Sequence, residues 1–172
     1  NLFCYPVTPL TESAARADIR PIVCRQERIG LHMADAVSRL SSGRDIGVFA
    51  MQHGPGTENA YGGVAQAFSE SVPMLVLPTG YARHQRQVFP NFDAQRNFAH
   101  VSKLCESVAY AADIPNVFRR EFAALRSGCG GPLVIEIPRD VFNEDIADDF
   151  VYQPAKTVTY GPAPKDVEAA VR

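Results

Sequence analysis

The sequence lacks an excess of charge of either sign, a long hydrophobic run and closely spaced cysteines. Lys and Arg total 17 against 19 Asp and Glu, a formal net charge of −2, which argues against a nucleic-acid-binding protein because such proteins normally carry a basic face. No apolar run reaches the ~18–20 residues that a membrane span requires. The first residues lack a basic segment followed by an apolar core, so no signal peptide is expected. We therefore expect a cytoplasmic protein that binds neither membranes nor nucleic acids.

The cysteines are few and widely spaced, and none forms a Cys-x-x-Cys pair: Cys4, Cys24, Cys105 and Cys129. A disulfide framework is not expected in a chain of 172 residues with so few cysteines. Zinc sites usually bring their ligands in close pairs, so the sequence also gives little support to a metal site in this chain. We expect buried, reduced thiols.

The composition is that of a folded domain, with 46% hydrophobic and 21% charged residues. Short apolar runs alternate with segments whose apolar residues recur at the helical spacing. This alternation predicts β-α-β units, so we expect an α/β fold of three layers, α/β/α, with a mostly parallel central sheet. The predicted strands are 19–24, 46–52, 74–77, 107–112 and 133–137, the predicted helices are 27–40, 59–71 and 115–127, and 81–100 is expected to be a long irregular connection.

Two features stand at the carboxyl ends of predicted strands, which is where open parallel sheets bind their ligands. Glu27 follows the first predicted strand, and the loop Gly54-Pro55-Gly56 follows the second. Each has an ordinary structural explanation, because an acidic residue in a first helical turn interacts favourably with the helix dipole and Gly-Pro-Gly forms tight turns. The loop matches neither the Walker motif nor the G-x-G-x-x-G motif. A generic nucleotide-binding α/β protein that uses this loop stays open as an alternative.

Three motifs in order, with the remains of a fourth, carry a resemblance to a known family. They are R-Q-E at 25–27 followed by M-A-D at 33–35, G-P-G-T-E-N at 54–59, G-P-L-V-I-E-I-P-R-D-V at 131–141, and F-C-Y-P at 3–6. Together they resemble the N-terminal pyrimidine-binding (PYR) domain of thiamine-diphosphate-dependent enzymes of the acetolactate synthase and 2-keto acid decarboxylase group. The sequence departs from the family pattern at Gln26, where the family has His, and at Pro90 and Asn91, where it has Gln and Glu.

The resemblance implies a catalytic role for Glu27, which in this family hydrogen-bonds N1′ of the aminopyrimidine of thiamine diphosphate. Burial disfavours the charged form of a carboxyl group, so Glu27 can share a proton with the ring and favour the imino tautomer that removes the C2 proton of the thiazolium. The cofactor then carries out the carbon chemistry, decarboxylation or carboligation of a 2-keto acid. The implied cofactor-binding residues are Tyr5, Pro6, Glu27, Gly54, Pro55, Gly56 and Asn59.

Polar and small residues beside these motifs allow more than one interpretation. Asn59 could cap the predicted helix 59–71, or it could hold the loop and a polar substrate atom. His53 and Gln52 are candidates for the substrate side, although a lone His is more often structural than catalytic. Gly30 and Ala34 fit close approach of another subunit or ordinary core packing.

The sequence contains no Gly-Asp-Gly, the motif with which this family binds the diphosphate and Mg²⁺. The resemblance therefore implies that the PYR domain occupies 1–145, that 146–172 is a linker toward a missing central domain, and that this chain is a fragment holding half a site. Mg²⁺ is expected on the missing diphosphate domain, contributed by a partner subunit in at least a homodimer. The alternative is a non-catalytic domain of the same fold that serves subunit assembly or regulation.

Overall fold

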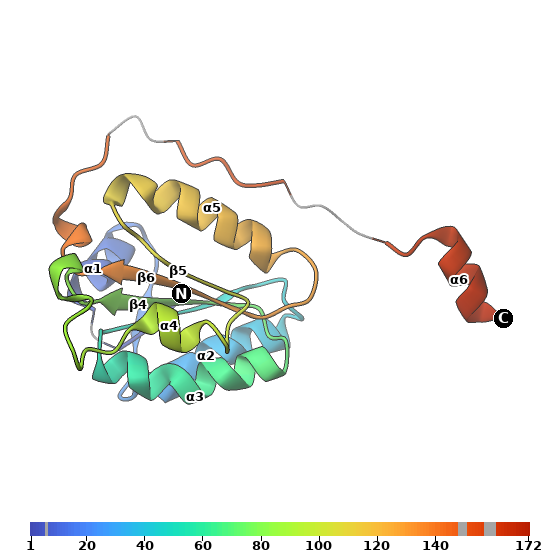
Figure 1. Ribbon diagram of the computed structural model, residues 1–172, viewed down its shortest axis with the longest axis horizontal. Helices are drawn as coiled ribbons and strands as arrows, with labels where there is room; N and C mark the ends of the chain where they lie inside the picture. The colour runs from blue at the N-terminus through green and yellow to red at the C-terminus, as the bar shows by residue number, and fades with distance from the viewer. Residues whose placement is uncertain (6, 148–150, 157–160) are drawn as a thin grey trace.

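The computed structural model describes residues 1–5, 7–147, 151–156 and 161–172 (Figure 1). Within these residues six strands form one sheet in the order β2-β1-β3-β4-β6-β5, and every pairing is parallel. Parallel strands joined by helices confirm the predicted α/β fold. The strands are β1 (Leu2–Cys4), β2 (Pro21–Val23), β3 (Gly47–Met51), β4 (Met74–Gly80), β5 (Leu104–Ser107) and β6 (Pro132–Pro138).

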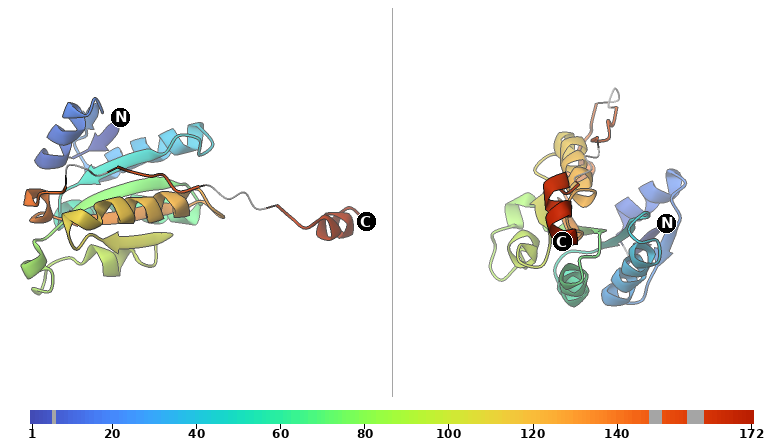
Figure 2. Two further views of the ribbon diagram at one scale, coloured as in Figure 1. Left: turned by 90° about the horizontal axis from the view of Figure 1, so that it is seen from above. Right: turned by 90° about the vertical axis from the view of Figure 1, so that its right-hand side faces the viewer.

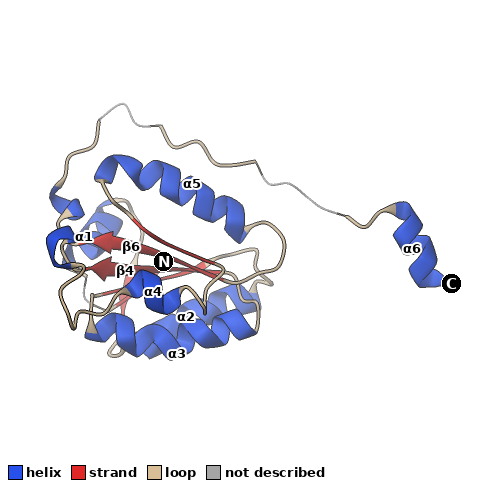
Figure 3. Cartoon of the chain, in the orientation of Figure 1, coloured by secondary structure: helices blue, strands red, loops and turns tan. Residues whose placement is uncertain are grey.

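Helices cover both faces of the sheet. The helices are α1 (Thr8–Arg16), α2 (Glu27–Leu40), α3 (Pro55–Ser69), α4 (Ala94–Phe98), α5 (Ile114–Leu125) and α6 (Pro164–Val171). Helices α1 and α5 lie on one face, and α2, α3 and α4 lie on the other (Figure 2). The sheet is thus the middle of three layers, as the strands between the helices in Figure 3 show. Helix α6 has no buried residue and lies apart from the layers (Figure 1).

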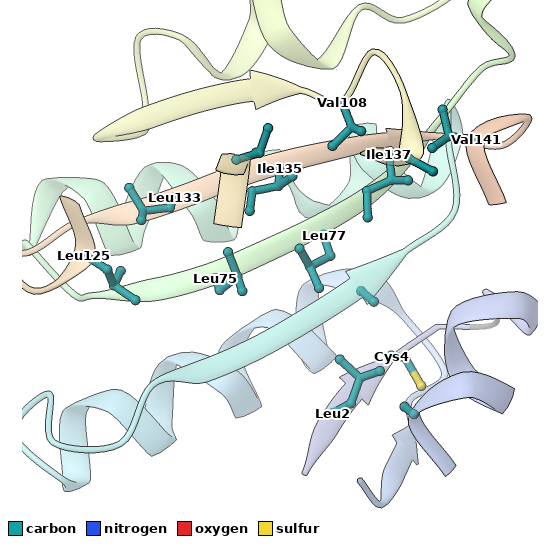
Figure 4. Packing of buried hydrophobic residues seen from close by; sticks show 14 residues of the cluster. Leu2, Cys4, Leu75, Leu77, Val108, Leu125, Leu133, Ile135, Ile137 and Val141 are labelled. Carbon is teal, nitrogen blue, oxygen red and sulfur yellow. The ribbon is translucent and has the colours of Figure 1, made fainter. Parts of the chain in front are cut away.

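The pleat of the strands divides the core into two apolar clusters. Leu75 and Leu77 of β4 and Ile135 of β6 belong to the cluster under α1 and α5 (Figure 4). Val76 of β4 and Val134 of β6 belong to the cluster under α2, α3 and α4. Every residue of β4 and β6 is buried, which agrees with the mainly apolar sequences of these central strands.

Several boundaries differ from the sequence prediction, each for a local reason. Strand β5 lies at Leu104–Ser107 instead of 107–112, because this half-buried edge strand reads L-C-E-S and has no apolar run. Helix α3 begins at Pro55 instead of Asn59, since proline is well suited to the first helical turn. The prediction lacks the three-residue strand β1 and the largely exposed helix α1, and it treats the short helix α4 as part of an irregular connection.

The strand order creates a switch point between β1 and β3. The chain leaves β1 through α1 to β2, then returns through α2 to β3, so α1 and α2 cover opposite faces. The carboxyl end of such a switch point is where doubly wound sheets bind ligands. Tyr5 follows β1, the first residue of α2 is Glu27, and Gly54 follows β3. The fold therefore brings the three segments that carry the sequence motifs to one edge of the sheet.

Cysteine placement corrects one expectation. All four cysteines are free thiols, but only Cys4 and Cys24 are buried, while Cys129 is exposed in the loop after α5. No described helix is long and apolar enough to cross a membrane. Within the described ranges, no group of three His, Cys, Asp or Glu side chains is placed to hold a metal ion.

Candidate functional site

Glu27 is a buried carboxyl group at the amino terminus of α2. The preceding residue, Gln26, has an extended backbone (φ −154°, ψ 140°) and is the N-cap, so the helix begins at Glu27 itself. An acidic residue in this first turn interacts favourably with the helix dipole. The side chain is only 4% exposed. This degree of burial distinguishes Glu27 from an ordinary first-turn carboxylate, which is solvated.

Asn59 reaches Glu27 from the neighbouring helix. Its Nδ2 donates a hydrogen bond to Oε2 of Glu27 at 3.1 Å. The capping interpretation of Asn59 is wrong, because the N-cap of α3 is Gly54 and Asn59 lies one turn inside the helix. The Asn59 side chain therefore hydrogen-bonds a buried carboxyl group that is 32 positions away in the sequence.

The Gly54-Pro55-Gly56 segment lies directly beside Glu27. A Cβ at position 56 would come within 3.0 Å of Oε1 of Glu27 and 2.6 Å of Cγ of Gln52. Gly54 has φ +60°, a left-handed conformation that strongly favours glycine. Thr57 Oγ1 donates to the carbonyl oxygen of Gln52 at 2.8 Å and ties the segment to the end of β3. Gly54 and Gly56, which we call the glycine notch, thus lie beside the carboxyl group, with the Tyr81 hydroxyl and the Gln52 side chain against the places that their Cβ atoms would take.

His53 and Tyr81 border the notch on its other side. Their rings meet edge to face with centroids 4.7 Å apart, and a Cβ at Gly54 would lie 2.5 Å from the Tyr81 hydroxyl oxygen. Burial, followed by the positive charge of Arg139, lowers the pKa of His53 below its usual value of 6.5, so the imidazole is neutral at pH 7. The sequence prediction missed Tyr81, although its position directly after β4 places it at the carboxyl edge of the strand beside β3.

Tyr5 and Gln52 lie at the same edge of the sheet. Tyr5 is half-buried, and its amide donates to the carbonyl oxygen of Ala50 at 3.1 Å. The Gln52 side chain is exposed beside Gly56. Pro6 lies outside the described residues. Gly30 is buried against Phe49, where a Cβ would come within 2.4 Å of the ring, so it serves core packing and not contact with another subunit.

A separate cavity of about 760 Å³ lies at the opposite, amino-terminal edge of the sheet. Its lining includes Arg39, which already pairs with Asp35 and Glu70. The cavity is formed where α2, α3 and α5 end. It shares no lining residue with the glycine notch.

The notch brings together a carboxyl group, an imidazole and a phenol. One carboxyl oxygen is held by an amide, the other faces a glycine with no side chain, and a neutral imidazole and a phenol stand nearby. This arrangement suits the edge of a flat, nitrogen-containing ring, because glycine permits close approach and a carboxyl group can both donate and accept a proton.

Comparisons with known proteins agree with this arrangement. Residues 2–113 match the family described as thiamine pyrophosphate enzyme, N-terminal TPP binding domain. A probable acetolactate synthase large subunit from Methanocaldococcus jannaschii is 30% identical over 96% of this chain and 29% of its own length. The 2-hydroxyacyl-CoA lyase 2 of Mus musculus is 32% identical over 78% of this chain and 21% of its own length. The chain thus spans less than a third of these relatives.

A solved structure gives the same fold. Benzoylformate decarboxylase from Polynucleobacter necessarius superposes with a TM-score of 0.82 over 98% of this chain and 32% of its own chain. The sequence identity is 22%, so this likeness concerns the fold alone.

Proposed function

This chain belongs to the thiamine pyrophosphate enzymes, as their N-terminal TPP-binding domain, and we propose that Glu27 binds the aminopyrimidine ring of thiamine diphosphate and activates it. In the complete protein this activation serves decarboxylation or carboligation of a 2-keto acid. The observation that carries the proposal is a buried carboxyl group whose Oε1 faces Gly56.

The residues at the notch fit the cofactor. Any side chain at position 56 would crowd Oε1 of Glu27, so glycine keeps this oxygen reachable for a ring atom. The cofactor supplies the carbon nucleophile, whereas the protein supplies orientation and proton transfer. Tyr5, Pro6, Gly54 and Pro55 complete the proposed pyrimidine site, and Asn59 contributes through its hydrogen bond to Glu27.

Glu27 would hold and move one proton. A carboxyl group can donate this proton from one oxygen and afterwards accept it back as a carboxylate, whereas the amide of a glutamine cannot. The low solvent exposure of Glu27 limits competition from water. His53 and Gln52, at the same edge, are proposed to face the 2-keto acid.

The rest of the site is proposed to come from other domains. Residues 1–145 would form the PYR domain, and 146–172 would lead to a central domain. Mg²⁺ and the diphosphate would be held by the diphosphate-binding domain of a partner subunit, because a magnesium site uses oxygen ligands together with phosphate. At least a homodimer follows from this arrangement. A cytoplasmic location stays a prediction.

Subunit assembly without catalysis is the second candidate. Helices α2 and α3 expose large apolar side chains, including Ile29, Leu40 and Phe68, and such side chains are common at interfaces between proteins. A domain used only for assembly has no need for the buried carboxyl group beside the notch, so activity of a Glu27 variant separates the two candidates.

The test uses the full-length protein loaded with thiamine diphosphate and Mg²⁺. Glu27→Gln keeps the shape of the side chain but removes the proton, so we expect the rate of hydrogen–deuterium exchange at C2 of the cofactor to fall by roughly 10²–10⁴-fold. Glu58→Gln, an exposed position on α3, is the control and should exchange at the wild-type rate. Wild-type exchange in Glu27→Gln would reject the proposed role and favour assembly alone.

A further inference from the structure

The two carboxyl oxygens of Glu27 have different environments. Oε2 accepts a hydrogen bond from Asn59 Nδ2 at 3.1 Å. Oε1 has no hydrogen-bond partner within the described part of the chain and is the oxygen that a Cβ at Gly56 would approach to 3.0 Å. One oxygen is therefore held by the protein, and the other has no hydrogen-bond partner among the described residues.

The packing of α2 against α3 makes this division possible. One turn beyond Glu27 lies Leu31, and one turn beyond Asn59 lies Gly63. A Cβ at Gly63 would come within 2.3 Å of Leu31 Cδ2, so glycine leaves room for the Leu31 side chain where α2 packs against α3. This packing brings the short Asn59 side chain within reach of the carboxyl group on the neighbouring helix.

The direction of the hydrogen bond decides where the proton of the acid can be. The Asn59 amide nitrogen only donates, so its partner Oε2 must present a lone pair. In a protonated carboxyl group the carbonyl-type oxygen is the better acceptor, so this bond favours the hydrogen on Oε1. If that proton were passed to a ligand, the carboxylate left behind would be stabilised at Oε2 by a charge-assisted hydrogen bond. Return of the proton to Oε1 restores the acid.

We propose that Asn59 is a positioning residue that fixes Oε2 of Glu27 as an acceptor and makes Oε1 the oxygen that exchanges a proton with the ligand. This inference rests on the proposed function of Glu27. It assigns to Asn59 a role toward the carboxyl group, instead of direct contact with the cofactor or the substrate.

Two variants of the full-length enzyme separate this role from a merely structural one. Asn59→Ala removes the donor, and Asn59→Asp keeps the shape but replaces the donor with a second carboxyl group that must share a proton with Glu27. Because Asn59 is exposed on the helix surface, both variants should fold, which thermal unfolding checks. Gln66→Ala, also exposed on α3, is the matched control.

We expect Asn59→Ala to slow C2 hydrogen–deuterium exchange by roughly 10- to 100-fold, the size expected for loss of a hydrogen bond to a charged group. The dissociation constant of the cofactor should change far less, because Asn59 does not contact it. Asn59→Asp should move the pH profile of exchange to higher pH. Crystal structures of the cofactor-free variants should show the Glu27 side chain displaced in Asn59→Ala, and unchanged in Gln66→Ala.

The inference and the proposed function fail in different ways. If Glu27→Gln abolishes exchange while both Asn59 variants keep the wild-type exchange rate, pH profile and Glu27 position, Asn59 has no positioning role and the proposed function stands. An equal loss of cofactor affinity and exchange rate in Asn59→Ala would also overturn the inference, since it would indicate direct contact with the cofactor. Normal exchange in Glu27→Gln removes the basis of both.

Discussion

Two buried glutamates on opposite faces of the sheet have very different surroundings. Glu27 is 4% exposed at the carboxyl edge, has one oxygen bonded to Asn59 and has the other beside a glycine. Glu121, on α5, is 0% exposed, and neither of its oxygens has a hydrogen-bond partner among the described residues. Burial, with a further contribution from the negative charge of Glu106, raises the pKa of Glu121 from 4.5 to about 8.

Burial of an acidic side chain therefore does not by itself make a functional site. Glu121 lies within the helix–sheet layer, where a protonated carboxyl is the form that costs least. Glu27 combines burial with a fixed partner and an open side, which are the features that proton transfer to a ligand needs.

Replacing Glu121 with Gln should remove a pH-dependent loss of stability. The pKa of Glu121 is raised in the folded state, so the unfolded chain loses its proton first and the free energy of unfolding falls as pH rises from about 4.5 to about 8. The free energy of unfolding of Glu121→Gln minus that of wild type should therefore be larger at pH 8 than at pH 5, by roughly 3 kcal/mol. Urea unfolding of the 172-residue chain at the two pH values measures this difference. A pH dependence identical to wild type would mean that Glu121 is solvated.

Filling the notch should weaken cofactor binding without unfolding the chain. Gly56→Ala puts a methyl group beside Oε1 of Glu27, and we expect the dissociation constant of thiamine diphosphate in the full-length enzyme to rise by roughly 10- to 100-fold, the effect of a clash that costs about 1.5–3 kcal/mol. Gly62→Ala, on the same helix with open space around its Cβ, is the matched control. Equal cofactor affinity in the two variants would place the pyrimidine ring elsewhere.

His53 should give a smaller pH effect of the opposite sign. Its pKa is lowered in the folded state, so its contribution to stability is complete above pH 6.5 and is lost as pH falls below that value. We expect His53→Asn to reduce the loss of unfolding free energy between pH 6.5 and pH 5 by no more than about 1 kcal/mol. The same urea series detects it, and an unchanged acid limb would show that the imidazole is solvated in the folded chain.

The features of the Glu27 site that depend on local sequence pattern could be predicted from the sequence. The range 27–40 is a helix as predicted, and Gly54-Pro55-Gly56 lies at the same edge as Glu27, because strand ends are recognisable from apolar runs and glycine. The pairing of Asn59 with Glu27 is not predictable in this way, since it depends on the distance between two helices.

The burial of Glu121 could not be predicted, for a different reason. It lies three residues after Phe118 and four before Leu125, so helical spacing already places it on the inward face of α5. A buried acid on that face is overlooked when only apolar residues are sought there. The degree of burial, and hence the raised pKa, becomes visible only when α5 is packed on the sheet.

The most direct measurement is a crystal structure of the full-length enzyme with thiamine diphosphate and Mg²⁺ bound. We expect N1′ of the aminopyrimidine to lie within hydrogen-bonding distance of Glu27 Oε1, about 2.6–3.2 Å, with Asn59 still bonded to Oε2. A pyrimidine ring bound away from the glycine notch, or a Glu27 side chain turned into bulk water, would contradict this expectation.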